Sequence, residues 1–367
     1  MIYIVCGTRP DIIKLAPVIH ELKKRFVPHR VVHTGQHYSK SLDQDLRNEL
    51  DIQIDFRLQV TIGRGVDASL HTIYTQFCKY LASDWEPNSK NMVVVYGDTL
   101  SALACATAAK AMQYDVGHIE AGLRSFDLTM PEEVARINID AISDRLYAPT
   151  YNAYENLMSE HHNPKSIKVF GNTIMNTLHK SMGKDCTSPD VDDLLLSHRV
   201  VSPFAVFTLH RPENVNADMT LKMCLKAAET IAVERDLKTI VFLCHPRTLP
   251  KVYPISEDSI FLPMESVPHH IMLGLISRSD FVMTDSGGIQ EECALLDKKL
   301  ITFRKSTERP ETLASGHNIL ISPYTHDFNK DDYVWEAVAH LNNLCMTEVT
   351  YGRNPAEDIA VDLANYF

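Results

Sequence analysis

This chain of 367 residues lacks the short motifs that identify many cofactor-dependent and metal-dependent enzymes. No Gly-x-Gly-x-x-Gly fingerprint follows the first β-rich segment, which argues against NAD as a cofactor. The sequence has no His-Glu-x-x-His motif or other metal-ligand spacing, and no Cys-x-x-Cys pair. We therefore expect a protein that needs neither a cofactor nor a metal ion.

An excess of positive charge is also absent, since the formal net charge is −11. That argues against nucleic acid or a membrane surface as the main partner, although a pocket with its own local field can still bind a small anion. No apolar run is long enough to span a bilayer, and no basic-then-apolar leader precedes the strand-like segment Ile2–Cys6. Most of the eight cysteines fall in apolar runs, as buried reduced thiols do. These features predict a cytoplasmic protein.

The sequence does contain a regular alternation of short β-rich runs and amphipathic helical stretches. This alternation predicts an α/β protein with parallel sheets covered by helices on both faces. The length suggests two such doubly wound domains, at ~150 residues each. The expected strands are Ile2–Cys6, Arg30–Thr34, Met92–Tyr96, Val116–Ile119, Arg145–Ala148, Ile167–Phe170, Phe204–Leu209, Thr239–Cys244, Phe281–Thr284 and Leu300–Phe303.

The boundary between the domains is expected near Gly171–Pro203, which contains a polar stretch without clear periodicity. We assign residues 1–172 to an N-terminal Rossmann-like domain and residues 173–353 to a C-terminal one. A last segment, residues 354–367, could pack back on the first domain. The expected helices include Ile12–Arg25, Leu100–Met112, Glu132–Ser143 and Glu357–Tyr366. We expect the two domains to face each other across a cleft.

The most informative segment is Thr284–Glu292, which follows a buried strand and opens into a helix. A strand, a Ser-Gly-Gly turn and a helix start bring bare backbone N–H groups close to an anion, and the helix dipole favours its negative charge. Ser286, Gly287 and Gly288 are therefore predicted to hold a phosphorylated ligand such as a nucleotide.

Polar side chains follow several of the expected strands directly. They are Arg9, Asp98, Glu120, His210, His245 and Ser286. Ligands of open α/β sheets bind outside the carboxyl ends of the strands, so these residues are expected to line a single cleft.

Each N-terminal motif also has a purely structural interpretation. Arg9, with Lys14 on the next helix, could bind phosphate or simply lie in a strand–helix turn. Asp98 could cap a helix. Glu120 could form an ion pair with Arg124, and Glu132 could pair on the surface with Arg136. Together, however, Asp98, Glu120 and Glu132 would gather carboxylates opposite a phosphate site, an arrangement that suits general acids and bases.

The motif at His210 and Arg211 in the C-terminal half likewise has both a functional and a structural interpretation. His210 and Arg211 could clamp a diphosphate leaving group or lie in a solvated loop, and His245 begins a weaker copy of this motif. Arg309 is expected to supply a further cation. The histidine pairs His161-His162 and His269-His270 are interpreted as surface residues.

In this order the motifs closely resemble the non-hydrolysing UDP-N-acetylglucosamine 2-epimerase family. The matching segments are Gly7-Thr8-Arg9-Pro10, Thr34-Gly35-Gln36-His37, Gly97-Asp98-Thr99, His118–Arg124, Pro131-Glu132-Glu133, Gly171-Asn172-Thr173, His210-Arg211, Thr284–Glu292 and Thr307–Glu311. The resemblance implies a GT-B-like fold of two Rossmann-type domains around a deep cleft, a homodimer, and a role in making glycan precursors. It implies interconversion of UDP-GlcNAc and UDP-ManNAc by elimination of UDP to a 2-acetamidoglucal and re-addition.

The resemblance also implies roles for individual residues. It implies that Asp98, Glu120, Glu132 and His210 are catalytic, and it leaves open which carboxylate removes and which returns the C2 proton. The implied substrate-binding residues are Arg9, Lys14, Arg136, Arg211, Ser286, Gly287, Gly288, Glu292 and Arg309, with Glu292 on the ribose. Gln36, His37 and His245 match part of an allosteric site for a second UDP-GlcNAc, whereas Tyr38-Ser39 departs from that pattern.

The sequence also departs from the family pattern at other positions. Asp11 stands where the family usually has Glu, and Pro212 stands where a polar residue is common. The segment Arg124–Met130 is shorter than in the best-known bacterial members and resembles archaeal members and epimerases of UDP-2,3-diacetamido sugar uronates. A diacetamido-uronate is therefore the alternative substrate. A hydrolysing epimerase, a retaining GT-B glycosyltransferase and a nucleotide-sugar sensor are the remaining alternatives.

Overall fold

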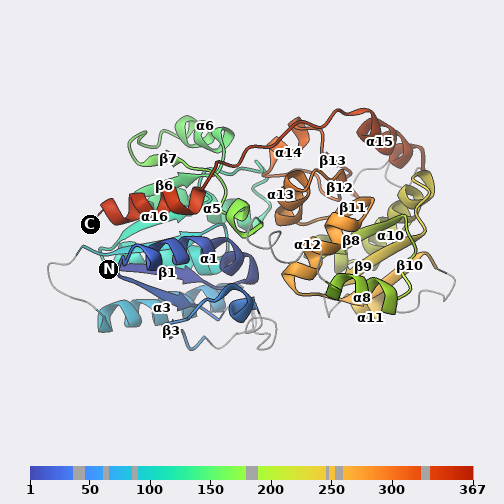
Figure 1. The fold of residues 1–367 in the computed structure, drawn as a ribbon. Coiled ribbons are helices and arrows are strands. Elements are labelled where there is room, and N and C mark those ends of the chain that lie inside the picture. Colours follow the sequence, from blue (N-terminus) through green and yellow to red (C-terminus); the bar gives the residue numbers. More distant parts are fainter. Residues whose placement is uncertain are drawn as a thin grey trace. The chain divides into compact units, whose positions relative to one another are not determined.

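The computed structural model describes residues 1–35, 46–60, 66–84, 90–178, 189–244, 248–252, 259–323 and 331–366. The chain divides into two compact units, which are described separately (Figure 1). Unit 1 comprises Met1–His179 and Thr350–Phe367, and unit 2 comprises Lys180–Val349. Each unit is built on a parallel sheet with helices, so the predicted α/β class is confirmed.

The sheet of unit 1 has the strand order β3-β2-β1-β4-β5-β6-β7, and its paired strands are parallel. Its strands are β1 (Ile2–Cys6), β2 (His29–His33), β3 (Phe56–Arg57), β4 (Met92–Tyr96), β5 (Asp115–Ile119), β6 (Arg145–Ala148) and β7 (Ile167–Val169). The order reverses between β1 and β4, where ligands of doubly wound sheets bind.

Side chains of the central strand β1 pack in a hydrophobic core with helices of unit 1. Tyr3 and Val5 of β1 contribute to a core with Phe77 of α3 and Ile139 of α5. The C-terminal helix α16 packs closely on α1. Arg25, which directly follows α1, pairs with Glu357 of α16. The helices of unit 1 are α1 (Arg9–Lys24), α3 (Val66–Ser83), α4 (Leu100–Ala111), α5 (Pro131–Ile142), α6 (Tyr151–Ser159) and α16 (Pro355–Asn365).

The sheet of unit 2 has the order β10-β9-β8-β11-β12-β13, again with parallel pairs. Its strands are β8 (Phe204–Leu209), β9 (Thr239–Cys244), β10 (Phe261–Glu265), β11 (Phe281–Thr284), β12 (Leu300–Thr302) and β13 (Asn318–Leu320). The strand order reverses between β8 and β11, the kind of position at which doubly wound sheets bind their ligands.

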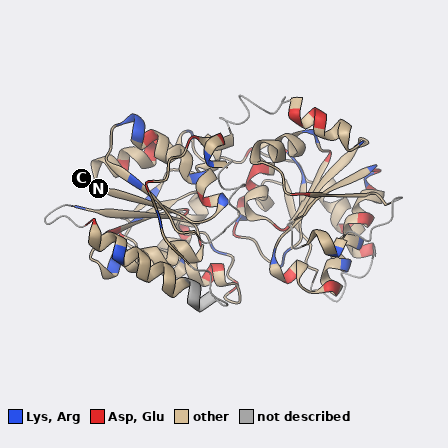
Figure 2. Ribbon diagram, turned by 90° about the horizontal axis from the view of Figure 1, so that it is seen from below, with Lys and Arg blue, Asp and Glu red and all other residues tan. Residues whose placement is uncertain are grey.

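The sheet of unit 2 has a hydrophobic core on each of its two faces. Phe207 packs in a core with residues of α10 and α15, whereas Val206 packs with residues of α8 and α12. The helices of unit 2 are α8 (Pro189–Ser197), α9 (Pro212–Val215), α10 (Asp218–Glu234), α11 (Leu249–Val252), α12 (His269–Arg278), α13 (Gly287–Leu295), α14 (Pro310–Ala314) and α15 (Asp331–Asn343). Acidic and basic residues occur on the elements of both units (Figure 2).

The predicted strands lie where expected, but β3, β10 and β13 were not predicted. Each of these is an edge strand of its sheet. β3 and β13 are too short to show a period, and β10 contains Pro263, which only an edge strand tolerates well. Among the described residues, no helix has the length and apolar character needed to cross a bilayer.

Candidate active site

The turns after β4 and β5 place Gly97 close to the predicted site residue Glu120 in unit 1. Gly97 has a φ of +63°, and a Cβ built on it would lie 3.2 Å from Glu120 Oε2. Glu120 itself has a φ of +74°, a left-handed conformation that costs energy for a residue with a side chain. The N–H groups of Glu120 and Ala121 both donate to the carbonyl of Tyr147, which holds this turn in place.

The carboxylate of Glu120 is buried and receives two hydrogen bonds on the same oxygen. Lys14 Nζ donates to Oε1 at 2.8 Å, and Tyr96 Oη donates to it at 2.5 Å. Both contacts stabilise negative charge on the carboxylate. The alternative interpretation of Glu120 as an ion pair with Arg124 is wrong, because Arg124 pairs instead with Asp140 and Glu160. Tyr96 was not identified from the sequence, since it lies in a plain apolar strand pattern.

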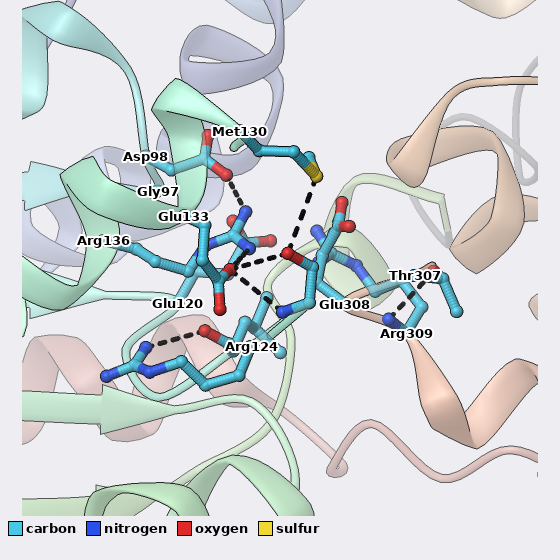
Figure 3. Close-up of polar contacts among 12 residues, drawn as sticks. Gly97, Asp98, Glu120, Arg124, Met130, Glu133, Arg136, Thr307, Glu308 and Arg309 are labelled. Atoms are coloured by element: carbon cyan, nitrogen blue, oxygen red, sulfur yellow. Dashed lines mark hydrogen bonds and ion pairs between the residues drawn. The ribbon is translucent and has the colours of Figure 1, made fainter. Parts of the chain in front are cut away.

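Asp98 forms an ion pair with Arg136 of α5 (Figure 3). Arg136 is buried and also donates to Glu133, at 2.6 Å. The alternative interpretation of Glu132 as a surface ion pair with Arg136 is therefore wrong. The cap of α4 is the side chain of Thr99 and not that of Asp98, so the helix-cap interpretation of Asp98 also fails.

Glu132 and Glu133 have different surroundings in the first turn of α5. Glu132 is exposed, whereas Glu133 is fully buried. Glu133 accepts from the N–H and the hydroxyl of Ser125, each at 2.9 Å, and from the N–H of Phe126. Glu133 thus anchors the segment that joins β5 to α5, and Glu132 keeps its carboxylate in contact with solvent.

A buried network of His118, Asp140 and Arg124 holds the turns after β4 and β5 in place. His118 Nε2 donates to the Gly97 carbonyl at 2.8 Å, and His118 Nδ1 lies 2.6 Å from Asp140. Asp140 also accepts from the N–H of Gly122 and pairs with Arg124. Burial opposes charge on Asp140, but His118 and Arg124 outweigh it and lower the pKa of this carboxyl. Asp140 was not predicted as a site residue, because it lies on α5 with no motif around it.

The turn after β1 is capped from within. Asp11 accepts from the N–H groups of Gly7 and Thr8 and from the Thr8 hydroxyl, at 2.9, 3.0 and 2.7 Å. Burial raises the pKa of Asp11 to about 6, although these hydrogen bonds oppose the shift. Arg9 is the first residue of α1 and is half-buried, and this burial lowers its pKa. The short Asp side chain fits this cap, where the family usually has Glu.

In unit 2, Ser286 is the N-cap of α13, and Gly287 and Gly288 are its first residues. The first N–H groups of a helix have no partner within the helix, and these glycines are half-buried rather than covered. A Cβ on Gly287 would lie 2.6 Å from Glu308 Oε1, so a side chain there would displace Glu308. The helix start therefore has the geometry of the predicted anion site.

Asp285 connects this helix start to His210 and Arg211. Its fully buried carboxylate accepts from the N–H groups of both residues and lies 2.7 Å from His210 Nδ1. Burial raises the pKa of Asp285, but His210 and the hydrogen bonds outweigh it and lower the value to about 2. Partial removal of the His210 imidazole from water lowers its pKa, but the Asp285 carboxylate outweighs this effect, so the net pKa is raised.

The remaining predicted residues of unit 2 are paired. Glu292 Oε1 lies 2.9 Å from His269 Nε2, and both side chains are buried. The interpretation of His269 as a surface residue is therefore wrong, because this first residue of α12 is buried against Glu292. Arg309 is buried and forms an ion pair with Glu291. Gln36, His37 and His245, predicted for an allosteric site, lie outside the described residues.

Arg9, Asp98 and Glu120 follow the neighbouring strands β1, β4 and β5 and lie at one edge of their sheet. His210 and Ser286 follow the neighbouring strands β8 and β11 of the second sheet. Such positions are typical of α/β proteins that bind a ligand at the carboxyl ends of their strands. The prediction that both sets of residues share one cleft stays a prediction.

The fold places the chain among Rossmann-like α/β proteins. It belongs to the UDP-N-acetylglucosamine 2-epimerase family, whose model matches residues 20–356. UDP-N-acetylglucosamine 2-epimerase of Methanocaldococcus jannaschii is 34% identical over 99% of this chain and 98% of its own length. UDP-2,3-diacetamido-2,3-dideoxy-D-glucuronate 2-epimerase of Pseudomonas aeruginosa is 31% identical over 86% of this chain and 87% of its own length.

A solved structure gives the same result. The crystal structure of the M. jannaschii UDP-GlcNAc 2-epimerase in complex with UDP-GlcNAc and UDP superposes with a TM-score of 0.89 at 33% identity, covering 100% of this chain and 99% of that one. The GT-B-like fold implied by the sequence resemblance is thereby confirmed.

Proposed function

We propose that this protein is a non-hydrolysing UDP-N-acetylglucosamine 2-epimerase that interconverts UDP-GlcNAc and UDP-ManNAc. The observation that carries this proposal is the match along nearly the whole chain to the M. jannaschii enzyme, whose structure contains UDP-GlcNAc and UDP. The carboxylates at the strand ends of unit 1 and the helix start of unit 2 supply the groups that this reaction needs.

The reaction begins with removal of the C2 proton and departure of UDP from C1. The C2–H and C1–O bonds break, a C1=C2 double bond forms, and the product is 2-acetamidoglucal. UDP then adds back to C1 while a proton is delivered to the opposite face of C2. Two differently placed acid–base groups suit these steps. We propose that these two groups come from among the three carboxylates of Asp98, Glu120 and Glu132.

The surroundings of these carboxylates suggest different tasks. Glu120 receives Lys14 and Tyr96 on Oε1, which stabilises its ionised form, and a carboxylate in this form can accept a proton. Glu132 is exposed and can exchange its proton with solvent. Asp98 pairs with Arg136, so a proton transfer at Asp98 is coupled to that cation.

Unit 2 would hold the UDP. We assign diphosphate binding to His210, Arg211 and the N–H groups of Ser286-Gly287-Gly288, with Arg9 as a further cation and Glu292 as the ribose ligand. A bound UDP that stays in place after the C1–O bond breaks can be recaptured by the glucal, which separates this reaction from hydrolysis. Homodimerisation, a cytoplasmic location, a role in glycan precursor synthesis and an allosteric site at Gln36, His37 and His245 stay predictions.

A second candidate substrate is UDP-2,3-diacetamido-2,3-dideoxy-D-glucuronate. The similarity to the P. aeruginosa enzyme over 86% of this chain favours it. The mechanism would be the same and only the sugar would differ. Sequence identity is higher for the M. jannaschii enzyme and extends over 99% of the chain, so UDP-GlcNAc is the leading substrate.

The test is incubation of the purified chain with UDP-GlcNAc in D2O, followed by NMR. The proposal predicts UDP-ManNAc together with deuterium at C2 of both sugars. Release of free sugar without UDP-ManNAc would indicate a hydrolysing epimerase, and turnover only with an added acceptor would indicate a glycosyltransferase. Exchange into the diacetamido-uronate but not into UDP-GlcNAc would establish the second candidate.

A further inference from the structure

Asp285 contacts both predicted diphosphate-binding segments of unit 2, although it was not predicted as a site residue. It follows β11 directly and precedes Ser286, the N-cap of α13. Its carboxylate accepts from the N–H of His210 at 3.1 Å, the N–H of Arg211 at 2.9 Å and Asn214 Nδ2 at 3.0 Å. A carboxylate with this many donors is held rigidly and keeps its charge.

The backbone of Asp285 contributes as well. Its carbonyl oxygen accepts from Arg211 Nε at 3.0 Å. Arg211 is therefore held through its main chain by the Asp285 carboxylate and through its guanidinium by the Asp285 carbonyl. This double attachment fixes the direction of a flexible side chain, and fixing it before binding reduces the entropy cost of binding.

The contact with His210 sets the orientation of the imidazole. Nδ1 lies 2.7 Å from Asp285 Oδ1, so Nδ1 carries the proton and Nε2 points away from the carboxylate. The His210 side chain is 51% exposed although its partner is fully buried, so Nε2 remains available to a ligand. The charged groups that act on His210 are Asp285, Arg211 and Arg304; the two arginines oppose its protonation, and Asp285 favours it.

We propose that Asp285 is a positioning residue that joins His210, Arg211 and the α13 helix start into one preorganised diphosphate-binding unit, with His210 presented as an imidazolium. This inference rests on the proposed function for the identity of the ligand. Asp285 does not touch the ligand itself. It keeps a proton on Nδ1 of His210 so that Nε2 can donate to a diphosphate oxygen.

The chain offers a matched control in Asp280, at the opposite end of β11. Asp280 accepts from the N–H of Phe204, the first residue of β8, at 2.9 Å. Asp285 accepts from the residues that follow the last residue of β8. Both carboxylates thus fasten β11 to β8, but only Asp285 contacts His210. Loss of Asp280 should reproduce the structural effect without the effect on His210.

The experiment compares the wild-type chain with Asp285→Asn and Asp280→Asn. The pKa of His210 is measured by NMR, with His210→Gln used to assign its signals, and the Kd for UDP is measured by calorimetry across neutral pH. We expect Asp285→Asn to lower the pKa of His210 and raise the Kd for UDP about tenfold or more, the usual range for a lost charged hydrogen bond. Asp280→Asn should leave both quantities within about twofold of wild type.

The pH dependence separates a positioning role from a purely structural one. UDP should bind the wild type more weakly as pH rises through the His210 pKa, and this loss should occur at lower pH in Asp285→Asn. Equal titration of His210 in the wild type and Asp285→Asn would overturn the proposal. If Asp285→Asn does not fold, the wild type still decides: its His210 must titrate above the usual ~6.5 and rise further on addition of UDP.

The result is distinguishable from a failure of the proposed function. A chain that binds UDP with this His210 linkage but does not epimerise UDP-GlcNAc would retain the role of Asp285 and refute the epimerase proposal. If the chain epimerises UDP-GlcNAc but the pKa of His210 does not change on addition of UDP, the epimerase proposal stands and the proposed role of Asp285 is refuted.

Discussion

Lys14 Nζ lies 2.8 Å from Glu120 Oε1, and both side chains are buried. Lys14 lies on α1, and Glu120 follows β5, so the contact joins two of the motifs at the carboxyl edge of the sheet. A lysine predicted to bind phosphate and a carboxylate predicted to move a proton are therefore neighbours. Any substitution of one changes the electrostatic surroundings of the other.

We expect Glu120→Gln to lower the epimerisation rate by about 10²–10⁴-fold, the usual loss for an acid–base group. The Kd for UDP should change little, because the residues assigned to UDP are mostly in unit 2. Steady-state kinetics and calorimetry measure these quantities. Glu160→Gln is the control: Glu160 pairs with Arg124 in the same unit and should leave the rate near wild type. Near-wild-type turnover by Glu120→Gln would refute its acid–base role.

The neighbouring glutamates of α5 should behave differently from each other. Glu132→Gln removes an exposed carboxylate and should lower the rate by about 10²-fold or more with little change in unfolding free energy. Glu133→Gln disturbs a buried carboxylate bonded to Ser125, Phe126 and Arg136, and should destabilise the chain by about 3 kcal/mol. Urea denaturation and kinetics on both variants check this. The reverse pattern would move the acid–base role to Glu133.

A tight backbone crossing within unit 1 should make Gly171 intolerant of substitution. Gly171 has a φ of +108°, and a Cβ on it would lie 1.9 Å from the Tyr351 carbonyl oxygen. Gly171→Ala should therefore lower the midpoint of thermal unfolding by several degrees or prevent folding. Gly288→Ala is the control for stability, since its nearest neighbour would be Ser286 Oγ at 3.9 Å. Equal stability of the two variants would contradict the close approach.

Protonation of Asp285 should contribute to the loss of unfolding free energy at low pH. Its pKa is lowered to about 2 in the folded chain, below its usual value, so folding favours the ionised form. The stabilisation is complete above about pH 4 and is lost as pH falls towards 2, and it amounts to about 2–3 kcal/mol. Asp285→Asn should therefore be less stable than wild type at neutral pH, with a smaller difference in acid. Urea denaturation at a series of pH values measures this, and a difference that does not change with pH would contradict it.

The interior strands could be predicted from the sequence because burial on both faces leaves continuous apolar runs such as Met92–Tyr96 and Phe204–Leu209. The edge strands could not, since β3 and β13 are too short to show a period and β10 carries a proline. The strands that precede Asp98, Glu120, His210 and Ser286 also lie where the sequence predicted them, and the functional roles of these residues stay predictions.

The partners of individual side chains could not be predicted from the sequence, because they depend on contacts between elements that are distant along the chain. Arg124 is close to Glu120 in sequence yet pairs with Asp140 and Glu160. Asp285 lies inside the most conspicuous motif, but its role appears only when β8 and β11 lie side by side. His269 reads as a surface residue beside Pro268, yet α12 directs it towards Glu292.

The most direct test of the account is a crystal structure of this chain with UDP and with UDP-GlcNAc. We expect the diphosphate oxygens within about 3 Å of the N–H groups at Ser286-Gly287-Gly288 and of His210 Nε2, with Asp98, Glu120 and Glu132 around C2 of the same sugar. A diphosphate bound elsewhere, or a sugar that none of the three carboxylates can reach, would contradict the claim that one UDP-sugar is held by unit 2 and transformed by the acids of unit 1.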